Sequence, residues 1–230
     1  MDLVAPKFAG IIAAAGLGAR FGGLKQQMVI ADKSVLQWSI DALRPHCALI
    51  VIAAPSERVA EFQSYETKTI VVVSGGATRV ASIVNAFVKI SAAFTNVLIH
   101  DAARPAVPAD LIDRVKQAAV EFGAAIPGLP VSDTIKRVRA DVIVETVDRS
   151  DLWAAQTPQG FRVDWYREVT RNSQLTTQNS KLKTQNYPVT DDASLFEQAG
   201  RPVKVVQGSE TNLKLTIPGQ LRVLENILKS

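Results

Sequence analysis

Cysteine and histidine are scarce in this sequence, and their scarcity excludes several kinds of site. Cys47 is the one cysteine among 230 residues, so the chain can form neither an intrachain disulfide nor a metal site built from cysteines. The two histidines, His46 and His100, argue against a catalytic His triad and against a multi-histidine metal centre. Neither kind of site is therefore expected here.

Long hydrophobic runs are missing as well. No apolar run reaches about 18 residues, so we expect no membrane span. Residues 1–7 are too short and wrongly charged for a signal peptide. A single thiol and no export signal are typical of the reducing cytosol, and we expect a cytoplasmic protein.

Basic residues are in only slight excess. The 26 Lys and Arg residues against 22 Asp and Glu residues give a formal charge of +4. A balance this mild and this evenly spread argues against nucleic-acid binding and suits a small anionic ligand. At roughly 100–200 residues per domain, we expect one domain over residues 1–230.

Apolar runs alternate with amphipathic segments along the chain. Such runs, rich in β-branched residues and separated by helical patterns, predict an α/β fold with a doubly wound, mostly parallel sheet. Ligands bind such sheets outside the carboxyl ends of the strands. The predicted strands are residues 8–15, 48–53, 69–73, 96–99, 203–206 and 212–216, and the predicted helices are residues 35–43, 79–90, 111–120 and 218–228.

Two later segments break the alternation. Residues 135–139 and 142–147 flank Ala140-Asp141 and predict a β-hairpin within an arm at about residues 133–150. Because an isolated hairpin is only marginally stable, we expect it to pack against a second subunit in a homodimer. Residues 172–186 are rich in Gln, Asn, Ser and Thr, which predicts a mobile surface loop.

A glycine-rich loop at residues 13–25 follows the first predicted strand. Its small residues would let backbone N–H groups approach phosphate oxygens. The glycine spacing is not that of the dinucleotide fingerprint, and the Walker sequence is absent. The loop adds two fixed cations, Arg20 and Lys25, which favours a triphosphate over a tight turn with surface charges.

The sequence HDAARP at residues 100–105 ends another predicted strand. Asp101 could hold Mg²⁺ directly or through water, and Arg104 offers a planar fork to a phosphate. Asp101 could equally cap a helix or pair with Arg104. We expect His100 to orient the strand end through a hydrogen bond rather than to act as a base.

Residues 75–82 lead from a predicted strand into a helix. Gly75 and Gly76 could expose backbone groups to a base or a ribose, and Ser82 lies one helical turn after Arg79, so both could face one pocket. A turn followed by a helix cap explains the same pattern equally well.

Together these motifs resemble the 2-C-methyl-D-erythritol 4-phosphate cytidylyltransferase family. No single block decides, but the blocks run in order from residue 13 to residue 216, and HDAARP and TPQ are the most telling. The remaining blocks are Ala14-Ala15-Gly16-x-Gly-x-Arg20, Lys25-Gln26, Gly76-x-x-Arg79-x-x-Ser82, Asp133-Thr134-x-Lys136, Arg149-x-x-Leu-Trp153, Thr190-Asp191-Asp192-Ala193 and Asn212-x-Lys214-x-Thr216.

The resemblance implies a Rossmann-like nucleotidyltransferase fold, a homodimer held partly by the arm, and the use of CTP with Mg²⁺. The phosphate of methylerythritol phosphate would attack the α-phosphorus of CTP and release pyrophosphate. The roles that the resemblance implies are: Arg20 and Lys25 on the triphosphate and the transition state; Ala14, Ala15, Gly16, Gly76, Arg79 and Ser82 on CTP; Asp101 by the metal; Arg149 and Lys214 on the sugar phosphate; and Arg104, Thr134 and Thr157 on the acceptor side.

Three alternatives stay open from the sequence. A ribitol 5-phosphate cytidylyltransferase shares a similar loop and TPQ block. A Rossmann NAD-dependent oxidoreductase needs an acidic residue at the end of the second strand, where this chain has Ala53-Ala54-Pro55 and Glu57 is a weak candidate. A non-catalytic nucleotide-binding protein would have lost a key cation, yet all of those named above are present.

Overall fold

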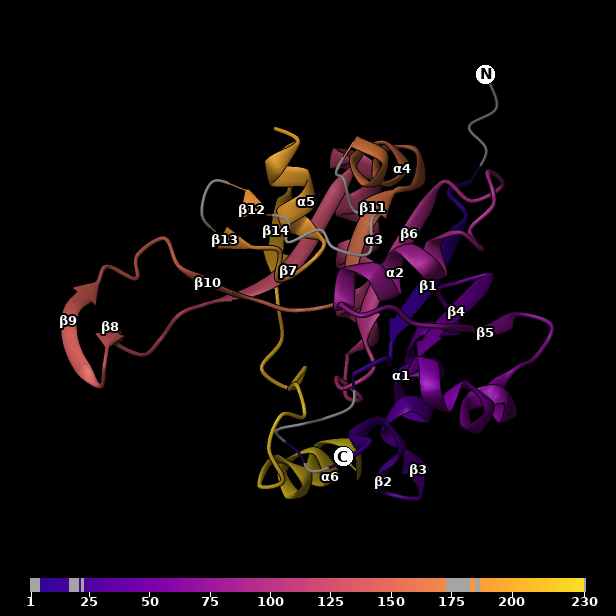
Figure 1. The fold of residues 1–230 in the computed structure, drawn as a ribbon, viewed down its shortest axis with the longest axis horizontal. Helices are drawn as coiled ribbons and strands as arrows, with labels where there is room; N and C mark the ends of the chain where they lie inside the picture. The colour runs from indigo at the N-terminus through magenta and orange to yellow at the C-terminus, as the bar shows by residue number, and fades with distance from the viewer. Residues whose placement is uncertain (1–4, 17–20, 22, 173–182, 185–186, 230) are drawn as a thin grey trace.

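A mixed, mostly parallel sheet runs through the middle of the molecule (Figure 1). The computed structural model describes residues 5–16, 21, 23–172, 183–184 and 187–229. Neighbouring pairs among β5, β4, β1 and β6 are parallel, β14 is parallel to β7, and β11 and β10 run antiparallel to their neighbours. Within the described residues the spatial order is β10 (Trp153–Ala155), β7 (Ala124–Pro130), β11 (Gln159–Arg162), β6 (Asn96–Asp101), β1 (Phe8–Ala13), β4 (Leu49–Ala54) and β5 (Ile70–Ser74), with β14 (Lys204–Gln207) also beside β7.

Helices cover both faces of this sheet and bury its apolar side chains in two cores. One core contains α2 (Arg79–Phe87), α4 (Val163–Asn172) and α5 (Ala193–Gln198), and the other contains α1 (Val35–Leu43), α3 (Ala109–Phe122) and the 3₁₀ segment η2 (Ser56–Tyr65). This arrangement confirms the predicted doubly wound α/β fold, with most strand and helix bounds within three residues of the expected ones.

Local chemistry sets the helix ends. The Ser34 hydroxyl accepts from the Gln37 N–H and begins α1, and the Thr78 hydroxyl accepts from the Ala81 N–H and begins α2. At the end of α3, Gly123 has φ +86°, and a Cβ there would lie 2.4 Å from the Trp165 ring. Only glycine therefore fits this turn into β7.

The predicted hairpin is present as a sheet of its own, on the left of Figure 1. It consists of β8 (Ile135–Arg139) and β9 (Val142–Val147), and the two residues between them, Ala140 and Asp141, have positive φ. Exposed apolar side chains line it, among them Val138, Val142, Ile143 and Val144. Its predicted role in a dimer stays a prediction.

The predicted strand at residues 212–216 is wrong. This segment is pinned instead to the turn after β6, since the Leu215 N–H donates to the Ala103 carbonyl and Arg104 donates to the Asn212 carbonyl. Its alternating pattern arises because Leu213 and Leu215 pack into a small third core while Lys214 lines a pocket. That core also holds α6 (Gln220–Lys229) and the ladder of β2 (Val29–Ile30) with β3 (Lys33–Ser34).

The polar segment predicted to be a mobile loop lies mostly outside the described residues. Its described part includes β12 (Lys183–Thr184), which pairs with β13 (Tyr187–Pro188). Among the described helices, none has the length and apolar character that a membrane crossing requires.

Candidate functional site

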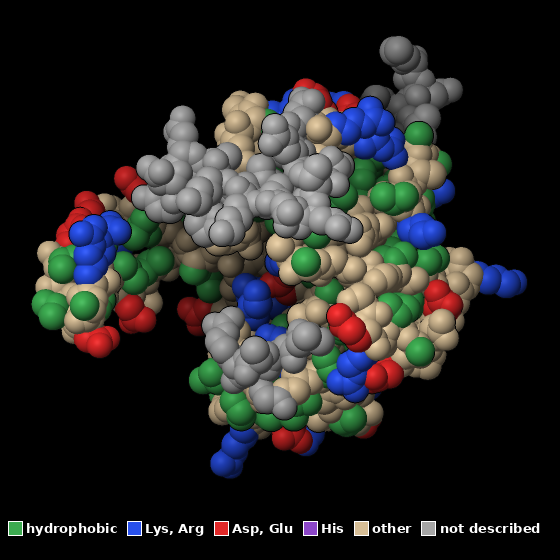
Figure 2. Space-filling model, viewed as in Figure 1, with side chains coloured by type: hydrophobic (Ala, Val, Ile, Leu, Met, Phe, Trp, Pro, Cys, Tyr) green, Lys and Arg blue, Asp and Glu red, His purple; other side chains and the backbone are tan. Residues whose placement is uncertain are grey.

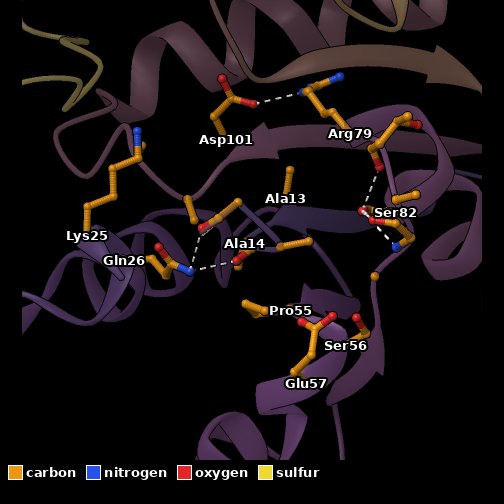
Figure 3. Close-up of a pocket in the computed structure, with 18 of the residues that line it drawn as sticks. Ala13, Ala14, Lys25, Gln26, Pro55, Ser56, Glu57, Arg79, Ser82 and Asp101 are labelled. Carbon is orange, nitrogen blue, oxygen red and sulfur yellow. Dashed lines mark hydrogen bonds and ion pairs between the residues drawn. The ribbon is translucent and has the colours of Figure 1, made fainter. Parts of the chain in front are cut away.

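A pocket of about 690 Å³ opens at the carboxyl ends of the central parallel strands. This is where open α/β sheets bind ligands, and the volume lies in the range of small-molecule sites. Figure 3 shows Lys25 and Gln26 on one side of it and Arg79 and Ser82 on the other, with Ala13 and Ala14 between them. The predicted site residues that line it are Ala14, Ala15, Gly16, Lys25, Gly76, Arg79, Ser82, Asp101 and Lys214.

The loop after β1 is held in place by a glutamine. Nε2 of Gln26 donates to the carbonyls of Ala14 (2.8 Å) and Gly16 (3.2 Å). Lys25 begins the short 3₁₀ helix η1 (Lys25–Gln27), and its Nζ donates to the Leu215 carbonyl at 2.7 Å. Lys25 thereby joins the loop to the C-terminal segment. Arg20, the other predicted cation of this loop, lies outside the described residues.

The glycine pair after β5 is required by close packing. A Cβ on Gly75 would lie 2.5 Å from the Ala15 Cβ, so the two pocket loops can approach only with glycine there. Both glycines line the pocket and Gly76 is exposed, but their N–H groups have partners within the protein: the Gly75 N–H donates to the Ala54 carbonyl and the Gly76 N–H to the Ser82 hydroxyl. Ser82 is buried and also donates to the Thr78 carbonyl, so it shapes the loop.

Asp101 lies between two cations at the end of β6. Its Oδ1 accepts from Nε of Arg79 at 3.2 Å, and its Oδ2 accepts from Nζ of Lys214 at 2.6 Å. Burial alone would raise the pKa of Asp101, but the charges of Arg79 and Lys214 outweigh it and hold the pKa well below its usual range. The carboxylate is therefore charged at neutral pH. The expected pairing of Asp101 with Arg104 is wrong: Asp101 pairs with Arg79 and Lys214, and the Arg104 guanidinium donates to backbone carbonyls instead.

His100 makes hydrogen-bond contacts that hold the end of β6 in place, as predicted. It is fully buried, with Nε2 at 3.1 Å from the Arg104 carbonyl and Nδ1 at 3.1 Å from the Thr157 hydroxyl. The Thr157 hydroxyl in turn accepts from the Asp101 N–H at 3.0 Å. Burial lowers the pKa of His100 to about 4, so the ring is neutral at pH 7 and braces the strand end.

Three residues predicted on the acceptor side do not line the pocket. Arg104 is buried and donates to the Asn212 and Ala155 carbonyls, and Thr157 is buried beneath Asp101. Thr134 is exposed beside the hairpin, as is Arg149, which donates to the Ser132 carbonyl. Figure 2 shows basic side chains at the bottom of a hollow between the hairpin and the body.

The donor set fits a divalent cation held mainly by its ligand. Among the described residues, no group of three His, Cys, Asp or Glu side chains gathers in one place, so a cage made only of protein is absent there. Mg²⁺ commonly binds through one or two carboxylates plus substrate phosphates. Asp101 supplies one charged carboxylate in a pocket lined by cations that suit phosphates.

Sequence reasoning missed some residues of this site. Asp192 is completely buried and accepts from Nη1 of Arg79 at 2.5 Å, yet it stood only in a quoted block without a role. Gln26, which holds the loop after β1 through the Ala14 and Gly16 carbonyls, was likewise quoted and given no role. Ser56 lines the pocket without any motif to mark it, and so do Pro55 and Glu57, which the sequence analysis considered only for the oxidoreductase alternative.

Comparison with known proteins places the chain in a well-defined group. A family model described as 2-C-methyl-D-erythritol 4-phosphate cytidylyltransferase matches residues 8–230. Relatives with that name include one from Trichodesmium erythraeum, 38% identical over 228 residues that cover 95% of this chain and 97% of the relative. Another, from Microcystis aeruginosa, is 39% identical with the same coverage.

Solved structures agree with the sequence comparison. The crystal structure of the cytidylyltransferase from Thermus thermophilus superposes with a TM-score of 0.79 at 31% identity, covering 97% of this chain and 100% of that one. The enzyme of the same name from Francisella tularensis gives a TM-score of 0.80 at 28% identity, covering 96% and 99% of the two chains.

Proposed function

The chain belongs to the 2-C-methyl-D-erythritol 4-phosphate cytidylyltransferase family, and on that premise we propose that its pocket binds CTP with the triphosphate toward Lys25, Asp101 and Lys214. The reaction is that of the family: a cytidylyl group passes from CTP to methylerythritol phosphate in non-mevalonate isoprenoid biosynthesis. The observation that carries the proposal is the Asp101 carboxylate held between two cations where small-residue loops meet.

The chemistry needs positioning more than it needs a base. A phosphate oxygen of the acceptor forms a bond to the α-phosphorus of CTP, and the bond from that phosphorus to the bridging oxygen breaks, with its electron pair leaving on pyrophosphate. The attacking oxygen is already anionic, so no strong base is required. The barrier is the repulsion between two anions, which fixed cations lower by holding both in line.

Each proposed role follows from where the side chain lies. Lys25 lines the same pocket as residues 14–16 and would neutralise the triphosphate. Arg20 would act with it, a role that rests on the family motif alone. The small residues Ala14, Ala15, Gly16 and Gly76 leave room for the nucleotide, with Ser82 shaping the loop around it. Lys214, half-exposed at the pocket edge, would turn to the sugar phosphate.

We assign the metal, Mg²⁺, to Asp101. When bound, the ion would supply Lewis-acid polarisation of the phosphate oxygens and a template for the triphosphate. Asp101 would offer it an oxygen, while Arg79 holds the other oxygen of the same carboxylate.

The acceptor side is proposed to include Arg149 and Thr134 of the arm, with Arg104 and Thr157 beneath it. Because the arm forms a sheet of its own and exposes apolar side chains, we propose that it packs against a second copy in a homodimer. A cytoplasmic location stays a prediction that rests on the cysteine content.

Pyrophosphate release tests the proposed function. The purified protein with CTP and Mg²⁺ should release pyrophosphate faster with methylerythritol phosphate than with ribitol 5-phosphate, and omission of the sugar phosphate should stop the reaction. Faster turnover of ribitol 5-phosphate would overturn the acceptor. Tight NADH binding in a fluorescence titration, with no pyrophosphate release, would instead favour the oxidoreductase alternative.

A further inference from the structure

We propose that Tyr166 and Asp192 form a buried positioning pair that fixes the Arg79 guanidinium in the nucleotide pocket. This inference rests on the proposed function, since it assigns Arg79 a contact with bound CTP. It adds a tyrosine that lies outside the pocket and in none of the motifs read from the sequence.

The first step is the burial of Asp192. Its side chain has no solvent exposure, and a charge removed from water needs partners that replace its hydration. Oδ1 accepts from the Tyr166 hydroxyl at 2.7 Å and Oδ2 accepts from Nη1 of Arg79 at 2.5 Å. The two carboxylate oxygens are thus divided between a neutral donor and a cation.

The second step is the rigidity of Tyr166. Its ring is fully buried against Phe87, Phe161 and Phe196, with ring centroids 4.5, 5.8 and 6.2 Å away. Burial and the Asp192 charge raise the pKa of the phenol well above its usual value, so the hydroxyl keeps its proton and acts as a donor. A donor on a packed ring fixes the position of the carboxylate that it touches.

The third step is the difference between the two cations on Asp101. The Arg79 guanidinium pairs with the buried Asp192 and also with Asp101 in the pocket, and its side chain is 26% exposed. Lys214 touches the same carboxylate, but its side chain is 41% exposed. An incoming phosphate can therefore draw Lys214 away from Asp101, whereas Arg79 stays where the buried pair holds it.

A merely structural hydrogen bond would give the same contacts, so the test must separate the two roles. Tyr166→Phe keeps the ring and removes only the donor. Tyr65→Phe is the matched control, because the Tyr65 hydroxyl also makes a side-chain hydrogen bond, to Ser34 at 2.8 Å, and Tyr65 does not line the pocket.

The experiment is a double-mutant cycle on steady-state kinetics with the full chain, CTP, Mg²⁺ and methylerythritol phosphate. We expect Tyr166→Phe to raise KM for CTP by about threefold to tenfold with little change in kcat, and to add nothing further in an Arg79→Ala background. Tyr65→Phe should leave KM for CTP unchanged even where it lowers Tm.

Arg79→Ala leaves Asp192 buried without its cation and can fail to fold, so the cycle is repeated in Arg79→Lys, which keeps a charge there. If Tyr166→Phe lowers Tm but leaves KM for CTP unchanged, or if its effect is fully additive to that of the Arg79 variants, the positioning role is wrong. Failure of the proposed function has a different signature, since the unaltered chain would then release no pyrophosphate from CTP.

Discussion

Nζ of Lys214 donates to Oδ2 of Asp101 over 2.6 Å, although the two residues are 113 positions apart in the chain. The lysine proposed to bind the sugar phosphate is thus partly neutralised by a carboxylate of the same pocket. Substrate binding has to exchange this ion pair for one with phosphate, and the tests of the site follow from that exchange.

Loss of either pocket lysine should slow the reaction. We expect Lys25→Ala and Lys214→Ala each to lower kcat/KM by at least about tenfold, or roughly 1.4 kcal/mol, because each removes a cation that offsets phosphate repulsion. The measurement is pyrophosphate release. Lys89→Ala, an exposed lysine just after α2, is the control and should behave like the unaltered chain. Unaltered kinetics in both pocket variants would contradict the assigned roles.

Asp101 should make the fold sensitive to acid. Its pKa is well below the usual range in the folded chain, so the unfolded chain, with a carboxyl pKa of about 3.9, takes up the proton first as the pH falls. The stability that Asp101 contributes is therefore present above about pH 4 and is lost as the pH falls toward the folded-state pKa.

Asp101→Asn should accordingly flatten the pH dependence of the free energy of unfolding between about pH 5 and pH 3, as measured by urea titration. If the variant loses stability over this interval as steeply as the unaltered chain does, the ion pairs of Asp101 do not set its pKa.

His100 should stay neutral throughout the working range. With its pKa lowered to about 4 by burial, it should show no protonation step in an NMR titration from pH 8 down to about pH 5. The chain has two histidines, so the variant His46→Gln leaves a single histidine signal, which is then assigned to His100. The unfolded chain protonates near about pH 6.5, so His100 favours folding above that pH, and this contribution declines as the pH falls toward 4. A titration midpoint near 6.5 would contradict the burial argument.

The arm should carry the contacts of a dimer. We expect the unaltered chain to sediment as a dimer and the double variant Val142→Lys/Val144→Lys as a monomer, because two charges would enter an apolar contact. Val29→Lys, at a site 68% exposed on β2 and away from the arm, is the control and should leave the dimer intact. A monomer for the unaltered chain, or a dimer for the arm variant, would exclude the proposed interface.

Two turns should be improved by glycine. The β2–β3 turn and the arm turn are both Ala-Asp, and Ala31 has φ +46° and Ala140 has φ +45°. We expect Ala31→Gly to raise the free energy of unfolding by about 0.5–1 kcal/mol, since the left-handed conformation costs alanine more than glycine. Ala118→Gly, in the middle of α3, should lower it by about 1 kcal/mol or more. Urea titration measures both, and a loss of stability in Ala31→Gly would contradict the turn argument.

Local patterns predicted the parallel strands β1, β4, β5, β6 and β14 and the helices α1, α2, α3 and α6, and the Ala140-Asp141 break predicted both bounds of each hairpin strand. They missed β7, β10 and β11 of the same sheet and the helices α4 and α5. The pattern at residues 212–216 misled, because alternation records which side chains are buried and not whether a neighbouring strand is present to pair with.

The sequence predicted many of the residues that line the pocket, but not the contacts that those residues make. Motif residues along the first half of the chain meet in the pocket because they all follow strands of one parallel sheet. The contacts of Asp192 with Arg79 and of Tyr166 with Asp192 could not be predicted, since nothing in the local sequence around a buried carboxylate indicates which cation it pairs with. Arg104 looks in sequence like a phosphate fork, yet its guanidinium is buried against the Asn212 and Ala155 carbonyls.

The ion pairs Arg79–Asp192 and Asp101–Lys214 each span 113 residues, and both tie the first half of the chain to its end. During synthesis on the ribosome, the strands that form the floor of the pocket emerge well before the residues that complete its charges. A nascent chain that has not yet released Lys214 holds Asp101 without one of its two counter-charges. On the proposed function, CTP should therefore meet the full set of pocket charges only after the segment that carries Lys214 has been synthesised.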